Sequence, residues 1–333
     1  MNHIGQAVRI ALKGSPNALP RSAGKVTFAV VLAAAFAVKS SAAIIPFDVP
    51  GATNTFVVGV SPSGKYVVGR YTNALGSYGF IYDGSSYTST NFPGTSLTVF
   101  RGVNNAGVAV GSYTNSTSVT HGFQYNSGTF TTIDVSVYGT VATGINDSGT
   151  VSGTQFDSSS QAHGYITSGV TTTQYDFLGA AFTEFSGINN LGDAVGDAAN
   201  AGGMFGVLLN GTILSALSFP GANNTAAFGI NSAGAIVGSY NTIAGTGVCE
   251  GATDCSGFVD TGGIFQTIRV PGASQTRASS VTDSGVVYGF YRDATTGLVR
   301  GFIDTPDSIP EPSTLAMVGL ALAGMASARR RRK

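Results

Sequence analysis

A ten-residue pattern recurs six times along this chain, and no other feature restricts the possible folds as strongly. The pattern is Gly-Ile/Val-Asn-x-x-Gly-x-x-Val-Gly. Its four clear copies are Gly102–Gly111, Gly144–Gly153, Gly187–Gly196 and Gly229–Gly238. Two degenerate copies flank them, Gly59–Gly69 with one extra residue and Ser280–Gly289 without the first glycine. Successive closing glycines are 42, 42, 43, 42 and 51 residues apart, and the long interval holds an insertion around Cys249 and Cys255.

Two other elements share this period. One is a glycine followed by an aromatic residue, found at Gly79-Phe80, Gly122-Phe123, Gly164-Tyr165, Gly257-Phe258 and Gly301-Phe302, with Phe205-Gly206 as an inverted counterpart. The other is an apolar-polar-apolar segment that often runs into Pro-Gly, found at Phe47–Gly51, Asn91–Gly94, Ile133–Val135, Tyr175–Phe177, Ser218–Gly221 and Ile268–Gly272. Each unit therefore predicts about four short strands, with the Asn-x-x-Gly segment as a tight hairpin whose glycine adopts left-handed backbone.

A four-stranded unit that repeats every 40 to 45 residues is typical of a β-propeller blade. A β-solenoid has a shorter period, and a β-sandwich needs no repetition. The order of the strand types is offset, because the chain begins with the last type (Ile45 to Val49) and ends with the Gly-aromatic strand (Arg300 to Asp304). We therefore predict an all-β, six-bladed propeller over residues 44–304, closed by its N-terminal strand, since closure removes exposed sheet edges.

The charge is divided unevenly along the chain, although its formal net value is zero. Residues 1–43 carry five basic residues and no acid, and residues 329–333 are all basic. Residues 44–309 hold seven basic and sixteen acidic residues, which leaves a net charge of −9. An acidic body argues against a nucleic-acid partner, because phosphate binding requires the opposite field.

The N-terminus has the features of a secretory signal peptide. A basic region ends at Lys25, an apolar run follows from Val26 to Val38, and small residues stand at Ser41 and Ala43. We expect a signal helix and cleavage by signal peptidase after Ala43. The alternatives are a buried helix or a membrane anchor, but thirteen apolar residues are too few to span about 30 Å of hydrocarbon.

The C-terminus combines three elements in a fixed order. Pro310-Glu311-Pro312 is followed by an apolar segment at 315–328, predicted to form a short hydrophobic helix, and by the basic tail at 329–333. Residues 305–333 are therefore predicted to form a linker and a sorting signal. In this signal, the hydrophobic helix inserts in the membrane and the basic tail stays on the cytoplasmic side. A plain C-terminal anchor is the alternative.

This tail resembles the PEP-CTERM sorting signal of Gram-negative bacteria, with Pro310-Glu311-Pro312 as its defining motif. The resemblance implies transient insertion in the membrane, processing by an exosortase, and release or re-anchoring in the cell envelope or outside the cell. Proteins of this kind tend to accompany exopolysaccharide production and biofilm formation. The body resembles the HAF-type extracellular repeats over roughly residues 44–304, with His121-Gly-Phe as a partial match, and this second resemblance implies no established chemistry.

Few residues of the body suggest catalysis, and we predict no catalytic residue, cofactor or metal site. His121 and His163 stand at equivalent places, and without an acidic residue at matching positions they make a poor metal site. Asp48, Asp134 and Asp176 share one repeat position. As a pair in the propeller channel they would suit glycoside cleavage, whereas as polar members of alternating strands they would be structural.

Cys249 and Cys255 stand in the one clear insertion of the repeat. Because exported proteins fold in oxidising compartments, we expect a disulfide that staples this loop.

A variable segment follows each closing glycine, and four of these segments begin at Tyr71, Tyr113, Tyr240 and Tyr291. Equivalent loops of a propeller emerge on one face, so we expect a surface rich in Tyr, Ser and Asn that suits carbohydrate recognition. The alternative is a set of unconstrained solvated loops. The leading hypothesis is a non-enzymatic envelope or matrix module that binds polysaccharide or another surface component. Its rivals are a polysaccharide-active hydrolase or lyase with channel carboxylates, and a purely structural matrix protein.

Overall fold

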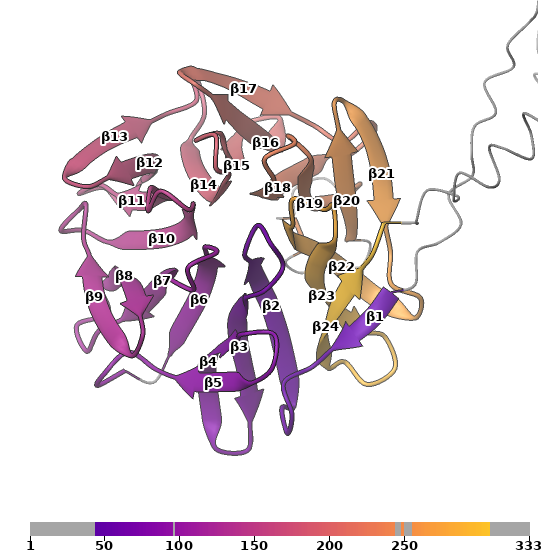
Figure 1. Cartoon of the computed structure of the whole chain (residues 1–333). Coiled ribbons are helices and arrows are strands. Elements are labelled where there is room, and N and C mark those ends of the chain that lie inside the picture. The colour runs from indigo at the N-terminus through magenta and orange to yellow at the C-terminus, as the bar shows by residue number, and fades with distance from the viewer. Residues whose placement is uncertain (1–43, 96, 244–247, 250–254, 307–333) are drawn as a thin grey trace, which may run out of the picture. The chain divides into compact units, whose positions relative to one another are not determined.

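The chain folds into six four-stranded antiparallel sheets that surround a central channel as the blades of a propeller (Figure 1). The structure is a computed structural model that describes residues 44–95, 97–243, 248–249 and 255–306. Every regular element in these ranges is a strand. The predicted all-β, six-bladed architecture is confirmed, whereas the expected signal helix within 1–43 and the hydrophobic helix at 315–328 lie outside the described residues.

The inner and second strands of the blades form the wall of the channel. The inner strands are β2 (Asn54–Val60), β6 (Thr98–Val103), β10 (Thr140–Ile145), β14 (Phe182–Ile188), β18 (Asn224–Ile230) and β22 (Ala273–Val281). The second strands are β3 (Val67–Asn73), β7 (Ala109–Thr114), β11 (Val151–Phe156), β15 (Ala194–Asn200), β19 (Ile236–Asn241) and β23 (Val287–Asp293).

The third and outer strands complete each blade. The third strands are β4 (Gly76–Tyr82), β8 (Thr120–Asn126), β12 (Ala162–Ser168), β16 (Gly203–Asn210), β20 (Ser256–Thr261) and β24 (Val299–Asp304). The outer strands are β5 (Tyr87–Thr90), β9 (Thr129–Ile133), β13 (Thr171–Tyr175), β17 (Ile213–Leu217), β21 (Ile264–Ile268) and β1 (Ile44–Phe47).

The last blade is closed by the first strand, as the offset of the repeat predicts. In Figure 1 the indigo β1 lies beside the yellow β24, and Ile44 pairs with Asp304 in this antiparallel ladder. Pro46, which has no amide hydrogen to donate, is tolerated because β1 is an edge strand. The strand ends at Phe47, two residues before the predicted end, because the side chain of Asp48 accepts a hydrogen bond from the amide of Gly301 (3.3 Å).

The aromatic residues of the third strands fill the space between neighbouring blades. Phe80, Phe123, Tyr165, Phe258 and Phe302 have no solvent-accessible surface. In the fourth unit Gly206 pairs with Asp197, where the other blades place the glycine of the Gly-aromatic pair, and the fully buried Val207 takes the aromatic position. Gly206-Val207 is therefore the true counterpart, and the prediction of an inverted Phe205-Gly206 pair is wrong.

In each blade, a threonine that belongs to none of the motifs identified above stabilises the connection from the preceding blade. It is buried, it lies on the inner strand, and its hydroxyl accepts a hydrogen bond of 2.8–3.1 Å from the backbone of the segment that enters the blade. The six residues are Thr55, Thr98, Thr140, Thr183, Thr225 and Thr276. Their spacing follows the repeat, so their periodicity was available in the sequence.

The hairpin of the repeat motif forms as predicted. The glycine of each Asn-x-x-Gly turn has a positive φ, as at Gly107 (+78°) and Gly149 (+81°), which a residue with a side chain adopts only under strain. The first glycine of the motif serves a different purpose, because it allows neighbouring inner strands to approach closely. A Cβ atom at Gly187 would lie 2.7 Å from the carbonyl oxygen of Phe228 in the next blade.

Candidate functional site

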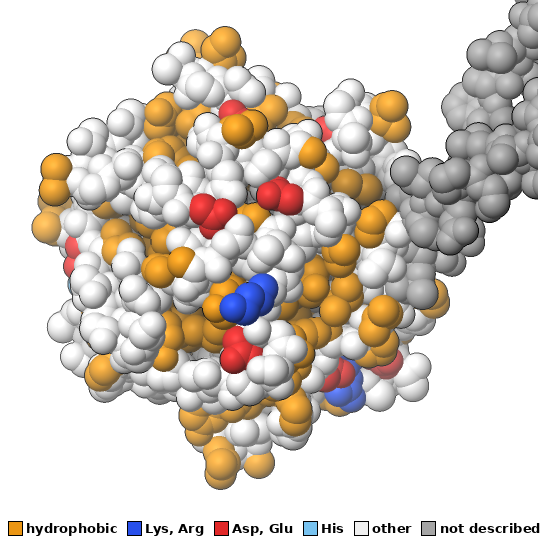
Figure 2. Space-filling view, viewed as in Figure 1, with side chains coloured by type: hydrophobic (Ala, Val, Ile, Leu, Met, Phe, Trp, Pro, Cys, Tyr) orange, Lys and Arg blue, Asp and Glu red, His pale blue; other side chains and the backbone are white. Residues whose placement is uncertain are grey.

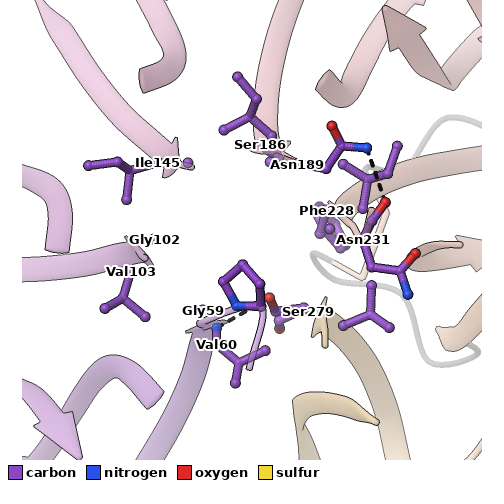
Figure 3. Close-up of a pocket in the computed structure, with 18 of the residues that line it drawn as sticks. Gly59, Val60, Gly102, Val103, Ile145, Ser186, Asn189, Phe228, Asn231 and Ser279 are labelled. Atoms are coloured by element: carbon purple, nitrogen blue, oxygen red, sulfur yellow. Dashed lines mark hydrogen bonds between the residues drawn. The ribbon is translucent and has the colours of Figure 1, made fainter. Parts of the chain in front are cut away.

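Each inner strand carries a β-bulge, and the bulges decide which side chains enter the channel. The register against the second strand shifts by one residue at the same place in all six blades. The extra residues form a ring that lines the channel: Val58, Arg101, Thr143, Ser186, Phe228 and Ser279. Three of them, Ser186, Phe228 and Ser279, are labelled around the pocket in Figure 3. The ring differs in chemistry from blade to blade although the backbone repeats.

At one end of the channel, the asparagines of the repeat motif join neighbouring blades. The Nδ2 of Asn146 donates to the carbonyl oxygen of Asn189 (3.1 Å), and the Nδ2 of Asn189 donates to that of Asn231 (3.0 Å), drawn in Figure 3. Asn104 and Asn231 make the equivalent bonds at the preceding and following junctions. Because the Oδ1 of each asparagine also accepts two amide hydrogens from its own turn, as Asn146 does from Ser148 and Thr150, the motif is explained by the architecture.

At the other end of the channel lies a larger cavity of about 480 Å³. It is bounded by the ends of the strands that lead into the hairpins between second and third strands, and by Val248 of the insertion. Its apolar lining includes Phe156, Phe182, Met204 and Phe228, and its charged lining consists of Arg101, Glu184, Asp197 and Arg277. This cavity combines aromatic surface with both signs of charge.

Two carboxylates lie side by side on one wall of the cavity. Glu184 on β14 and Asp197 on β15 are cross-strand partners, so their Cβ atoms are about 5 Å apart. Burial raises the pKa of Asp197 to about 7, and the charge of Glu184 raises it further, whereas Arg277 opposes the shift. Burial also raises the pKa of Glu184, against the effect of Arg101. Within the described ranges, neither carboxylate has a hydrogen-bond or ion-pair partner.

Arginines from two other blades face the same cavity. The Nε of Arg101 donates to the hydroxyl of Ser112 (3.2 Å), which orients the guanidinium. The guanidinium of Arg277 stacks on the ring of Phe228, 3.6 Å from its centroid. Burial lowers the pKa of Arg101, and Glu184 counteracts the shift. On the face drawn in Figure 2, charged side chains are sparse.

The aspartates considered for the channel lie elsewhere. Asp134 and Asp176 follow the outer strands β9 and β13, and Asp48 follows β1. The hypothesis that these residues form a carboxylate pair in the channel is therefore wrong, because their shared repeat position belongs to the periphery of the blade. Glu184 and Asp197 occupy the channel instead, and they could not be recognised from the repeat because no other blade carries acids at those positions.

The two histidines do have acidic partners, contrary to the sequence analysis. The Nδ1 of His121 lies 3.0 Å from Asp134, and the Nδ1 of His163 lies 2.6 Å from Asp176. Each pair joins a third strand to the segment after the outer strand of the same blade, 13 residues further on. No group of three or more His, Cys, Asp or Glu residues suited to a metal ion occurs in the described part of the chain.

The four predicted tyrosines belong to the second strands rather than to the loops that follow them. The rings of Tyr113 and Tyr240 stack on Phe92 and Phe219, with centroids 3.7 Å and 3.6 Å apart. Tyr71 is 9% exposed. Tyr291 is the fourth, on β23. Much of the aromatic surface offered for ligand binding is thus used in packing, and a role of these rings in binding stays a prediction.

The insertion reaches the rim of the cavity. The Cα atoms of Cys249 and Cys255 are 4.9 Å apart, a separation that a disulfide spans. The side-chain amide of Gln275 donates to the carbonyl oxygen of Cys249 (2.9 Å), which holds this end of the insertion against the inner strand β22. The stapling of the loop stays a prediction for peptide mapping.

Both predicted sorting signals lie outside the described residues, including Pro310, Glu311, Pro312 and the expected cleavage site after Ala43. In the ranges that the structure does describe, there is no helix long and apolar enough to cross a membrane.

Comparison with solved structures supports the fold. A TolB-like protein from Agrobacterium tumefaciens is 12% identical, with a TM-score of 0.53 over 69% of this chain and 88% of that chain. AofleA from Arthrobotrys oligospora is 11% identical, with a TM-score of 0.51 over 78% of this chain and 85% of that chain. A Trypanosoma rangeli sialidase is 10% identical over 86% of this chain and 60% of that chain, and its TM-score of 0.45 is too low to argue from. Identities this low show the propeller fold alone.

Sequence comparisons identify the C-terminus. No curated protein matches the chain, and the resemblance of the body to HAF-type repeats stays a prediction. Residues 308–332 match the PEP-CTERM protein-sorting motif. This motif implies that the β-propeller is exported to the cell envelope or the extracellular space and processed by an exosortase.

Proposed function

We propose that this exported propeller is a non-enzymatic module of the cell envelope or extracellular matrix that binds polysaccharide at the cavity of its channel. The observation that carries the proposal is one cavity that combines aromatic surface with two carboxylates, Glu184 and Asp197, to which no described residue donates a hydrogen bond. Carbohydrates offer apolar ring faces and many hydroxyl groups, so they suit walls that combine Phe156 and Phe182 with Arg101, Glu184 and Asp197.

The rim of the cavity extends this surface. The variable hairpins emerge on the same face, next to Tyr71, Tyr113, Tyr240 and Tyr291. We include these segments in the module as the region that would contact the further sugars of a long chain. If the protein is instead a purely structural matrix component, exchanging these hairpins between blades will leave polymer binding and matrix assembly unchanged.

The test is size-exclusion chromatography with light scattering on the exported protein, mixed with exopolysaccharide from the source bacterium. The wild type is expected to elute with the polymer, and Glu184→Gln is expected to elute separately. Asp176→Asn is the matched control, because it removes a carboxylate on the same face but outside the channel. Equal co-elution of all three proteins would reject the cavity as the binding site, and no co-elution of the wild type would reject the proposed function.

The paired carboxylates support a second candidate, a polysaccharide hydrolase or lyase. A carboxyl group with a pKa of about 7 is suited to donate a proton at neutral pH, and Asp197 fulfils this condition. Against this candidate, Glu184 and Asp197 project from adjacent strands of one blade, whereas the two carboxylates of a glycosidase flank the scissile bond. The same light-scattering run decides, because an enzyme shortens the polymer with time and Asp197→Asn abolishes the shortening.

A further inference from the structure

We propose that the cavity selects a sugar that carries a carboxylate, with Arg101 pairing with that group and Glu184 and Asp197 accepting hydrogen bonds from the ring hydroxyls. The inference rests on the proposed function and names its ligand class. It follows from how the charges of this acidic body are distributed around one cavity.

The cationic side of the cavity is suited to a carboxylate. Residues 44–309 hold only seven basic residues against sixteen acidic ones, and two of the seven, Arg101 and Arg277, line this cavity. The Nε of Arg101 is occupied by Ser112, while its two terminal nitrogens have no hydrogen-bond partner among the described residues. A guanidinium with both terminal nitrogens available binds a carboxylate through two parallel hydrogen bonds.

The position of Arg101 strengthens this assignment. Arg101 is the bulge residue of β6, so its side chain projects into the channel. Burial lowers the pKa of Arg101, and the positive charge of nearby Arg70 lowers it further. No carboxylate lies within ion-pair distance of Arg101 in the described part of the chain, although Glu184 faces it across the cavity. An anionic ligand group would relieve both the loss of hydration and the repulsion between the two guanidinium groups.

The acidic side of the cavity is suited to a ligand that donates hydrogen bonds. Asp197 is only 7% exposed, it lines the cavity, and none of the described residues donates a hydrogen bond to it. A buried carboxyl group without a partner is costly, so a ligand that supplies donors gains affinity there. Vicinal hydroxyl groups of a sugar ring meet this need, and Glu184 on the neighbouring strand can accept from the second hydroxyl.

The guanidinium and the two carboxylates stand on different walls of one cavity. Arg101 lies on β6, whereas Glu184 and Asp197 lie on β14 and β15 of another blade, so they belong to different walls of a cavity of about 480 Å³. Phe156 at the end of β11 and Phe182 at the start of β14, the strand of Glu184, line the same cavity and offer apolar contact for a ring face. A ligand with an acid at one end and hydroxyls at the other matches this order of groups.

The experiment is calorimetry at pH 7 with trigalacturonate and its methyl ester, which keeps every ring and hydroxyl but removes the charge. The wild type is expected to bind the acid at least tenfold more tightly than the ester. Arg101→Gln is expected to remove this preference, and Arg101→Lys, which keeps the charge but not the paired geometry, is expected to retain part of it. Lys65→Gln, a charge removal at an exposed turn, is the matched control and should bind as the wild type does.

Each outcome decides a separate point. Equal affinity for acid and ester would overturn the inference and leave the proposed function standing. A preference for the acid that survives Arg101→Gln would also overturn it, because the carboxylate would then bind elsewhere. Failure to bind either oligomer or the native exopolysaccharide would reject the proposed function itself. Thermal melts establish that the variants are folded. If Arg101→Gln does not fold, Arg101→Lys takes its place in the comparison of acid and ester.

Discussion

Replacing Asp197 with asparagine should stabilise the folded protein at neutral and alkaline pH, relative to wild type, and lose this advantage in acid. Asp197 is 7% exposed and faces Glu184 across the strand pair. Burial is the main cause that raises the pKa of Asp197 from 3.8 to about 7. The folded protein therefore holds this proton more tightly than the unfolded chain does.

The size of the effect follows from this difference in pKa. A carboxyl group with a raised pKa in the folded state contributes its full stability below the unfolded value, near 3.8, and loses it as the pH rises to about 7. A shift of about three units corresponds to about 4 kcal/mol. The asparagine variant has no proton to lose, so its free energy of unfolding relative to wild type should rise by about 4 kcal/mol between pH 3.5 and pH 8.

Urea unfolding at closely spaced pH values measures this difference directly, because contributions common to both proteins cancel. Asp83→Asn is a control of opposite sign, since hydrogen bonds from Ser86 and Ser85 lower the pKa of Asp83. That carboxylate stabilises the fold above its unfolded pKa and ceases to do so in acid, so its variant should be weaker at neutral pH. A constant difference between Asp197→Asn and wild type at every pH would refute the reasoning.

Three further changes test other parts of the structure. Asn146→Ala should lower the free energy of unfolding by about 2–4 kcal/mol in urea, because it leaves the carbonyl of Asn189 and two turn amides unsatisfied. Asn146→Asp keeps the turn acceptor and loses only the donor to Asn189, so it should cost less than Asn146→Ala but more than nothing; a wild-type stability of Asn146→Asp would reject the link between blades. The hydrogen bond to Asp176 raises the pKa of His163 above 6.5, so the wild type should exceed His163→Gln in melting temperature most strongly below pH 6.5. This excess should vanish as the pH rises through the raised pKa, and a difference independent of pH would contradict it. Non-reducing peptide mapping should recover Cys249 linked to Cys255, and Cys249→Ser should cost about 2 kcal/mol, whereas alkylation of either thiol without reductant would exclude the disulfide.

The fold could be predicted because the blades share their backbone requirements. A glycine that needs positive φ, as at Gly107, and a glycine that allows close strand approach, as at Gly187, recur in nearly every blade and are visible as a period. The offset of the strand types then predicts closure of the ring. The motif asparagine is visible for the same reason, although its role in joining blades requires the three-dimensional arrangement.

The candidate site could not be predicted from the period of the repeat. It is formed by positions that carry different residues in different blades. Arg101 and Ser186 occupy the same bulge in different blades, and sequence periodicity gives no signal for either. The aspartates that do recur, such as Asp134, recur because they are structural. The positions to search for function are therefore those where the strand pattern is constant and the residue changes.

The pairing of β1 with β24 also sets the order in which an exported chain can complete its fold. The bond between Asp48 and Gly301 joins residues 253 positions apart. A chain that emerges N-terminus first presents β1 at the outset and its partner only after five blades have followed. Until then the last blade lacks its outer strand and the ring stays open, since contacts of such sequence separation form only after a long loop closes. The ring can therefore close only after the whole body has emerged, and any step that needs the finished cavity must come after closure.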